Sequence, residues 1–269
     1  MKLTAIGVIL LLPALALSAT FVQTKQMALP AGDINELRVH CGAGSLYIVN
    51  ADWQNTIRVF AEIEVENLNK SDYQGFAEKN VVLSLDRKGQ RAILKSDLRR
   101  TFRHPVDARI NLTIEVPRGM DVHIDDGSGP IHIQYFSGRL DIKDGSGLIT
   151  VEKVVGSVKV ADGSGKIIME DIQGNVEIRD GSGSVDVNKI RGDVRVTDGS
   201  GTISIQYVDG NLTVTDGSGA IDINDITGNV LIREPGTGEL NIERIQGTVT
   251  TQNEIEDEDE DISPQIRDE

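Results

Sequence analysis

The tetrapeptide Asp-Gly-Ser-Gly occurs six times in this chain, and each copy begins 18 residues after the one before it. The copies begin at Asp126, Asp144, Asp162, Asp180, Asp198 and Asp216. A degenerate seventh copy, Pro235-Gly236-Thr237-Gly238, follows after a one-residue insertion. Self-similarity at a fixed period is typical of repeat architectures, in which each unit stacks on its neighbours. The repeat therefore predicts a stacked array.

Each unit holds two short stretches in which apolar and polar residues alternate. In one unit these are Ile149 with Val151, and Val158 with Val160 after a second glycine, with the lone apolar Val154 between them. Period-two alternation predicts β-strands with one buried face. A unit of 18 residues leaves no room for a crossover helix between parallel strands. The predicted fold is all-β, a parallel β-solenoid of 18-residue coils with two strands in each coil.

The outward positions support in-register stacking, because residues one repeat apart become lateral neighbours and like charges are disfavoured there. One column reads Asp141, Lys159, Glu177 and Arg195. A second reads Lys153, Asp171, Lys189, Tyr207, Asp225 and Arg244. A third, of polar residues suited to carbohydrate or protein contact and equally to plain solubility, reads Gln134, Glu152, Glu170, Asn188, Gln206 and Asn224. A slip of one residue would also turn the core outward.

The same stacking lines up six aspartates along an edge of the coil about 5 Å apart, where repulsion is roughly 1 kcal/mol per neighbour even in water. One interpretation is turn chemistry, in which each carboxylate accepts hydrogen bonds from the amides one and two residues on. The other is a ladder of bound cations on Asp126, Asp144, Asp162, Asp180, Asp198 and Asp216. Calcium-binding nonapeptide repeats do not match, because this chain has core residues such as Ile131 and Ile149 where they place an aspartate.

The start of the chain predicts export. Lys2 precedes an apolar run from Ile6 to Leu17, and Ala16-Leu17-Ser18 has the small-x-small pattern of a cleavage site. The run is shorter than the ~20 residues that span a bilayer, although an uncleaved anchor is the alternative. We therefore predict a signal peptide over residues 1–18, no later transmembrane segment, and a location in the periplasm, at the cell surface or outside the cell.

The remaining sequence divides into three predicted regions. Residues 30–120 alternate less regularly, show no long helical period, and are expected to form an irregular β entry and cap. Residues 121–252 form the regular coils. Residues 253–269 begin with an acidic run and are expected to be a disordered tail. Lys95, Arg99, Arg100 and Arg103 make a local basic patch, which is either a solvated loop or an anion or partner site.

Composition and residue placement argue against several activities. The net charge of -15 makes nucleic acid a poor partner. Cys41 is the only cysteine, so no internal disulfide forms, and its alternation with Leu37 and Val39 predicts a buried thiol. A serine repeated in six identical turns favours architecture over catalysis. The four histidines lack metal-ligand spacing, and stacking sets only His123 beside Asp141. No catalytic, cofactor-binding or metal-binding residue is predicted beyond the aspartate ladder.

The entry Val116-Pro117-Arg118-Gly119, followed by units of Gly-x-Val-x-Val-x-Asp-Gly-Ser-Gly-x-Ile-x-Val, resembles the bacterial putative adhesin family over roughly residues 35–250. This family is a domain of unknown function, built as a β-solenoid and found in exported or envelope proteins. The resemblance implies that fold and an envelope location, and it supplies no catalytic residues.

The leading hypothesis is a non-enzymatic exported envelope protein, an adhesin-like β-solenoid with a repetitive binding or scaffolding surface. Its partner would be an envelope protein or a carbohydrate. The alternatives are a polysaccharide-acting β-helix enzyme, which would need its site in the irregular N-terminal part, and a cation-binding repeat protein that uses the aspartate column.

Overall fold

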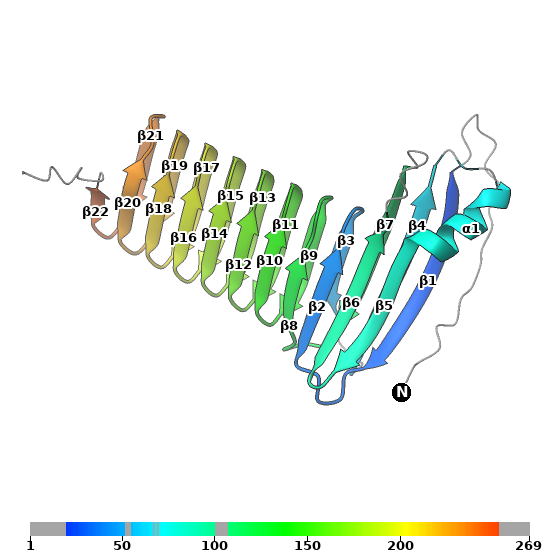
Figure 1. Ribbon diagram of the computed structural model, residues 1–269. Coiled ribbons are helices and arrows are strands. Elements are labelled where there is room, and N and C mark those ends of the chain that lie inside the picture. The colour runs from blue at the N-terminus through cyan, green and yellow to red at the C-terminus, as the bar shows by residue number, and fades with distance from the viewer. Residues whose placement is uncertain (1–19, 52–54, 67, 69, 100–106, 253–269) are drawn as a thin grey trace, which may run out of the picture.

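The computed structural model describes residues 20–51, 55–66, 68, 70–99 and 107–252. These residues form two 11-stranded sheets, called sheet A and sheet B here, and one helix. Figure 1 shows the coils stacked in a row, with sheet B toward the viewer and sheet A behind it. The predicted all-β solenoid is confirmed.

The order of the strands within each sheet defines the stack. Sheet A contains, in spatial order, β1 (Phe21–Pro30), β4 (Thr56–Val65), β7 (Ala108–Val116), β3 (Leu46–Asn50), β9 (Ile131–Ser137), β11 (Gly147–Val155), β13 (Gly165–Gln173), β15 (Gly183–Arg191), β17 (Gly201–Asp209), β19 (Gly219–Ile226) and β21 (Leu240–Ile245). Sheet B contains β5 (Val81–Lys88), β6 (Arg91–Leu98), β2 (Glu36–Cys41), β8 (Asp121–Asp125), β10 (Leu140–Asp144), β12 (Val158–Asp162), β14 (Val176–Asp180), β16 (Val194–Asp198), β18 (Leu212–Asp216), β20 (Val230–Pro235) and β22 (Val249–Gln252).

Neighbouring strands of the regular coils pair in parallel with a register of one repeat. Ile149 lies beside Ile167 in sheet A, and Val158 lies beside Val176 in sheet B. The predicted charge column is confirmed, because Asp141, Lys159, Glu177 and Arg195 are successive lateral neighbours. The one-residue insertion appears as a register shift between β18 and β20, after Thr215.

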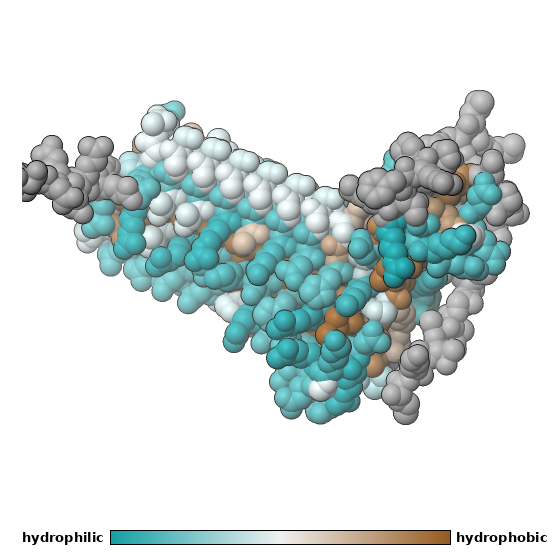
Figure 2. All heavy atoms as spheres, in the orientation of Figure 1, coloured by the Kyte–Doolittle hydropathy of each residue, from teal (hydrophilic) through white to brown (hydrophobic). Residues whose placement is uncertain are grey.

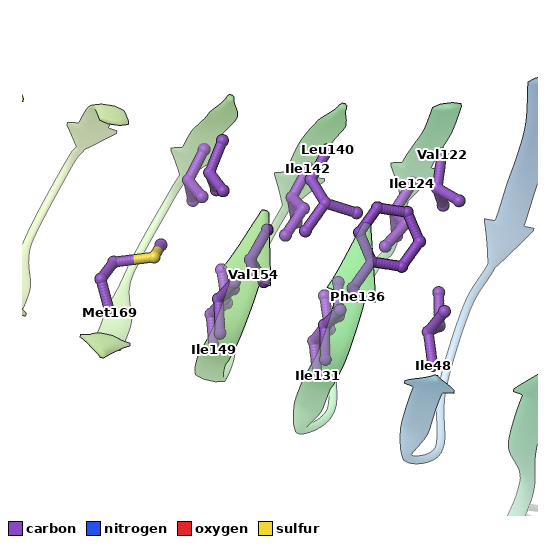
Figure 3. Packing of buried hydrophobic residues seen from close by; sticks show 14 of the residues in the cluster. Ile48, Val122, Ile124, Ile131, Phe136, Leu140, Ile142, Ile149, Val154 and Met169 are labelled. Atoms are coloured by element: carbon purple, nitrogen blue, oxygen red, sulfur yellow. The ribbon is translucent and has the colours of Figure 1, made fainter. Parts of the chain in front are cut away.

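The core is a thin layer of mostly β-branched and leucine side chains between the two sheets. Figure 3 shows these side chains pointing from both sheets into the space between them. Val122 and Ile124 are fully buried, as predicted. Phe136 is the largest of the fully buried side chains. Because aromatics are only 4% of the chain, the interior depends on packing many small aliphatic groups.

An outward corner interrupts every strand of sheet A in the regular coils. After Val151 two successive residues turn away from the core, and the second, Lys153, has a left-handed backbone with φ of 54°. This corner directs the next residue, Val154, back into the core. The same conformation recurs with φ between 52° and 57° at Tyr135, Asp171, Lys189, Tyr207, Asp225 and Arg244. Non-glycine residues rarely adopt it, so its recurrence marks it as part of the architecture.

The N-terminal region does not stack in sequence order. Strands β2 and β3 lie beside β8 and β9, with Leu37 next to Val122 and Leu46 next to Ile131. Strands β6 and β7 form the next layer, and β1, β4 and β5 follow as antiparallel strands. The coil therefore begins two layers before the first Asp-Gly-Ser-Gly copy, and antiparallel strands close its end.

The region predicted as an irregular β entry and cap also contains one short helix. Helix α1 (Lys70–Asn80) lies at the N-terminal end of the stack (Figure 1). The Tyr73 ring stacks on Phe21 of β1 with 5.3 Å between ring centroids, and Ala77 is buried. With only 11 residues, α1 is too short to show a sustained helical period. It adds to the cover over the open edges of the first strands.

The C-terminal end of the stack is less covered. In β21 and β22, Leu240 and Val249 take core positions of their rung, yet they are 37% and 43% exposed. Among the described residues no helix is long and apolar enough to cross a membrane. The predicted signal peptide, the acidic tail, and Arg100 and Arg103 of the basic patch lie outside the described residues.

Candidate functional site: a buried aspartate column and a polar groove

The repeated aspartates lie inside the coil, which corrects the expectation that they line its edge. Asp144 follows Leu140 and Ile142 on the inward face of β10 and is 7% exposed. Asp162, Asp180 and Asp198 repeat this placement, and Asp216 is fully buried. The five residues are direct lateral neighbours across adjacent strands. The sequence analysis predicted the column but placed it along an edge, although period-two alternation continued from Leu140 and Ile142 would have placed Asp144 inward.

Turn chemistry satisfies only part of each carboxylate. The amide of the serine two residues on donates to one oxygen, at 3.3 Å for Ser182 to Asp180 and 3.2 Å for Ser218 to Asp216. The glycine amide one residue on also lowers the pKa of Asp144, Asp162, Asp180 and Asp198, so both amides of the predicted turn act on the carboxylates. At least one oxygen of every aspartate in the column has no hydrogen-bond partner. Buried polar atoms without partners are uncommon in native proteins and call for an explanation.

The electrostatics of the column disfavour ionised carboxylates. Burial, followed by repulsion from a neighbouring carboxylate, raises the pKa of Asp144, Asp162 and Asp180 to about 6. Burial also raises the pKa of Asp126, Asp198 and Asp216. Two charges separated by one strand spacing of about 4.8 Å repel by roughly 3 kcal/mol at an effective dielectric constant of about 20.

Neutral residues end the column on both sides. At the N-terminal end Cys41 is hydrogen-bonded to Asp126, and the buried Ser96 lies beside Cys41. Burial, with the nearby Asp126, raises the pKa of the Cys41 thiol, so it stays protonated. At the other end Pro235 lies beside Asp216. Cys41 packs against the core, in agreement with the inward face predicted for it.

Cys41 also reveals a copy of the repeat that sequence reasoning missed. The segment Cys41-Gly42-Ala43-Gly44 takes the place of Asp-Gly-Ser-Gly in the rung before Asp126, and Ala43 bridges Ser128. The spacing of two glycines was the available signal. It escaped the search because 85 residues, rather than 18, separate this copy from the next.

A cation ladder finds no support in the donor arrangement. Within the described part of the chain, no group of three or more His, Cys, Asp or Glu residues is placed to hold a metal ion. The predicted neighbour of His123 is present, with its Nδ1 3.4 Å from the Asp141 carboxylate, and His40 lies 3.1 Å from Asp125. Both contacts lie on the outer face of sheet B and are partly exposed.

The outer face of sheet B contains a shallow groove of about 560 Å³ that runs across strands β8 to β18. Figure 2 shows this face as mainly hydrophilic. One row of lining residues is the outward column His123, Asp141, Lys159, Glu177, Arg195 and Thr213. The other row precedes the strands and consists of Arg139, Ser157, Asn175, Asp193 and Asn211. The apolar lining residues, such as Leu140, are buried and offer little surface.

Hydrogen bonds between rungs build one wall of the groove. The side-chain oxygen of Asn175 accepts from the Asp193 amide at 3.0 Å, and Asp193 accepts from the Asn211 amide at 2.8 Å. Asn211 and Asn229 continue the series with bonds of 3.0 and 2.9 Å to the next rungs. These side chains bond to backbone amides of the next rung, whereas the outward column forms the other row of the groove lining. Its members form ion pairs, such as Lys159 with Glu177 at 3.1 Å.

The wall yields a first testable prediction. Replacing Asn211 by alanine removes the acceptor for the Asn229 amide, and we expect a loss of about 1 kcal/mol in the free energy of unfolding. Asn224 is the matched control, because its side-chain oxygen has no partner. Urea unfolding of both alanine variants measures the difference. Equal losses would show that the bonds between rungs add nothing.

The other predicted polar surfaces are dispersed. In the Gln134 column, Glu170 pairs with Lys189 at 3.1 Å and Glu152 lies 3.9 Å from His132. Within the basic patch, Lys95 lies on the outer edge of β6 and Arg99 follows it.

Comparison with known proteins leaves the family open. No protein-family model and no curated protein matches the chain. Solved structures that are similar include a putative cell adhesion protein from Clostridium sporogenes (12% identity, 87% of this chain, 100% of that chain, TM-score 0.36). A putative adhesin from Bacteroides fragilis is 11% identical, covers 85% of this chain and 97% of its own, and has a TM-score of 0.39. A putative lipid binding protein from Parabacteroides distasonis is 11% identical, covers 86% of this chain and 96% of its own, and has a TM-score of 0.34. Two of these names agree with the resemblance seen in the sequence. Likeness at this level carries no argument about function.

Proposed function

We propose that this protein is a non-enzymatic, adhesin-like module of the cell envelope whose sheet B groove binds an extended polar polymer. The observation that carries the proposal is the groove itself, which presents the same two positions from successive rungs across six strands. A site that repeats along one axis suits a ligand that repeats along its own length. The apolar run before residue 18 supports export of the chain.

The chemistry of the lining favours a polysaccharide over a protein. Protein interfaces are centred on apolar and aromatic anchors in desolvated pockets, whereas the groove is lined by no Phe, Tyr or Trp and its apolar lining residues are buried. Three acidic and three basic side chains line the groove, namely Asp141, Glu177, Asp193, Arg139, Lys159 and Arg195. The groove thus lacks the net negative charge of the whole chain. We propose a linear, largely uncharged polysaccharide held by hydrogen bonds, with little dependence on salt.

The test is binding of the purified protein to a panel of soluble linear polysaccharides, neutral and acidic, measured by affinity electrophoresis. We expect Ser157→Trp to weaken binding to a neutral polysaccharide by tenfold or more, equivalent to about 1.4 kcal/mol, because the indole fills the groove. Thr202→Trp, on the opposite sheet, is the matched control because Thr202 is exposed outside the groove.

Three outcomes would contradict the proposal. If the protein binds no polysaccharide, the proposed ligand class is wrong. If both tryptophan variants weaken binding equally, the groove is not the binding site. Cleavage of a bound polysaccharide, detected as new chain ends, would show an enzyme. Thermal melts of both variants verify that they are folded.

A further inference from the structure

We propose that the buried aspartates of the column hold protons in the folded protein, so that the solenoid takes up protons as it folds and is more stable in mildly acidic than in neutral solution. Each uptake converts a carboxylate and a proton from the solvent into a neutral carboxylic acid. No other bond changes. This inference concerns the core of the array and does not depend on the proposed groove ligand.

The geometry of the column carries the inference. Asp144, Asp162, Asp180, Asp198 and Asp216 are between 93% and 100% buried and follow one another without an intervening residue. At least one oxygen of each lacks a hydrogen-bond partner. Adjacent ionised carboxylates would repel with no donor between them, whereas a neutral carboxylic acid supplies an O–H donor that its neighbour can accept.

In the part of the chain that the structure describes, no cationic side chain compensates the column. The titratable groups that act on the column are its own aspartates and Cys41. Asp125, which acts on Cys41, adds a further negative charge. The basic residues that directly precede two of the aspartates, Lys143 and Arg179, are exposed on the opposite face of sheet B. Ser96 and Pro235 close the ends without charge. Protons are therefore the available means of neutralisation.

The sign of the pH dependence follows from the direction of the pKa shifts. The folded pKa of Asp144, Asp162 and Asp180 is about 6, above the ordinary value of 3.8. The folded state therefore binds more protons than the unfolded state between these two values. The destabilisation is complete above the folded pKa and is relieved as the pH falls through about 6 toward 3.8.

The experiment compares the urea-unfolding midpoint of the full chain at about pH 7.5 and about pH 5. The variant Asp162→Asn/Asp180→Asn keeps the size of the side chains and the acceptor for the serine amide, but removes two ionisable groups. We expect the wild-type midpoint to rise on acidification. The variant should have the higher midpoint at neutral pH and a smaller rise. Asp209→Asn, an exposed carboxylate in the same array, should follow the wild type and so corrects for the general effect of net charge.

Two results would overturn the inference. If wild type and the double asparagine variant respond equally to pH, the column holds no protons in this range. If calcium chloride raises the neutral-pH midpoint of the wild type, EDTA reverses it, and the double variant does not respond, the column binds a cation instead. An unchanged midpoint with calcium supports protons. If the double variant is unfolded at neutral pH, Asp162→Asn alone repeats the comparison. The single variant is then expected to show the higher neutral-pH midpoint and the smaller rise.

Discussion

Replacing Gly201 by alanine is expected to unfold much of the array. Gly201 ends one Asp-Gly-Ser-Gly turn with φ of +145°, and a Cβ there would lie 1.7 Å from the carbonyl oxygen of Gly183 in the preceding rung. The neighbour is backbone, so it cannot move aside without breaking the stack. We expect a loss of more than about 4 kcal/mol in the free energy of unfolding, measured by urea unfolding followed by circular dichroism.

The control for this substitution is Gly75→Ala in helix α1, where no atom lies within 4 Å of the added Cβ. Alanine in the middle of a helix is favoured over glycine by roughly 0.5–1 kcal/mol, so this variant should be slightly more stable than the wild type. A Gly201→Ala protein that melts with the wild type would show that adjacent turns are further apart than the structure places them.

Replacing Phe136 by alanine is the second large effect. Phe136 is 1% exposed and occupies the lone apolar position of the rung next to the N-terminal layers. Truncating a fully buried phenylalanine costs about 3–5 kcal/mol, because the transfer free energy is lost and a cavity remains. The thin core has few long side chains that could fill this cavity. Denaturant unfolding measures the loss.

The residue before it provides the comparison. Tyr135 is 56% exposed at the outward corner and contacts the Lys153 side chain through a 3.0 Å hydrogen bond and a ring contact of 4.6 Å. Tyr135→Ala should change the free energy of unfolding by about 0.5 kcal/mol or less. Similar losses for both alanine variants would contradict the inward and outward assignment of these adjacent residues.

The repeat predicted the regular part of the fold because every rung has the same alternation of apolar and polar residues and buries the same positions. Once Val158 and Val160 are assigned to a strand, their equivalents one repeat away must be their neighbours, and the pairing with Val176 and Ile178 confirms this. The charge column of Asp141 and Lys159 provided an independent check on the register.

The N-terminal layers could not be predicted in the same way. Strand β2 lies beside β8, although about 80 residues of other structure intervene, and its glycines form a turn only in that context. The antiparallel pairing of β1 with β4 and the helix α1 depend on tertiary contacts such as the stacking of Phe21 on Tyr73. Local patterns contain no information about these contacts.

The candidate sites were predictable as columns but not as shapes. The sequence placed His123 beside Asp141 and aligned the aspartates, and both are confirmed. The alternation was not extended to Asp144, which turns inward, and the sequence did not show that the row containing Asn175 bonds to the next rung. These features depend on the direction of side chains at the ends of strands, where the regular alternation of inward and outward side chains gives way to a turn.

The two ends of the stack differ, and this difference bears on how the number of repeats can vary. Antiparallel strands and α1 seal one end, whereas Leu240 and Val249 at the other end remain open to solvent. Each rung contacts only its immediate neighbours. Duplication or loss of one 18-residue unit inside the array would therefore lengthen or shorten the polar face while both ends stay as they are. The length of this surface can thus vary independently of the N-terminal layers that close the stack.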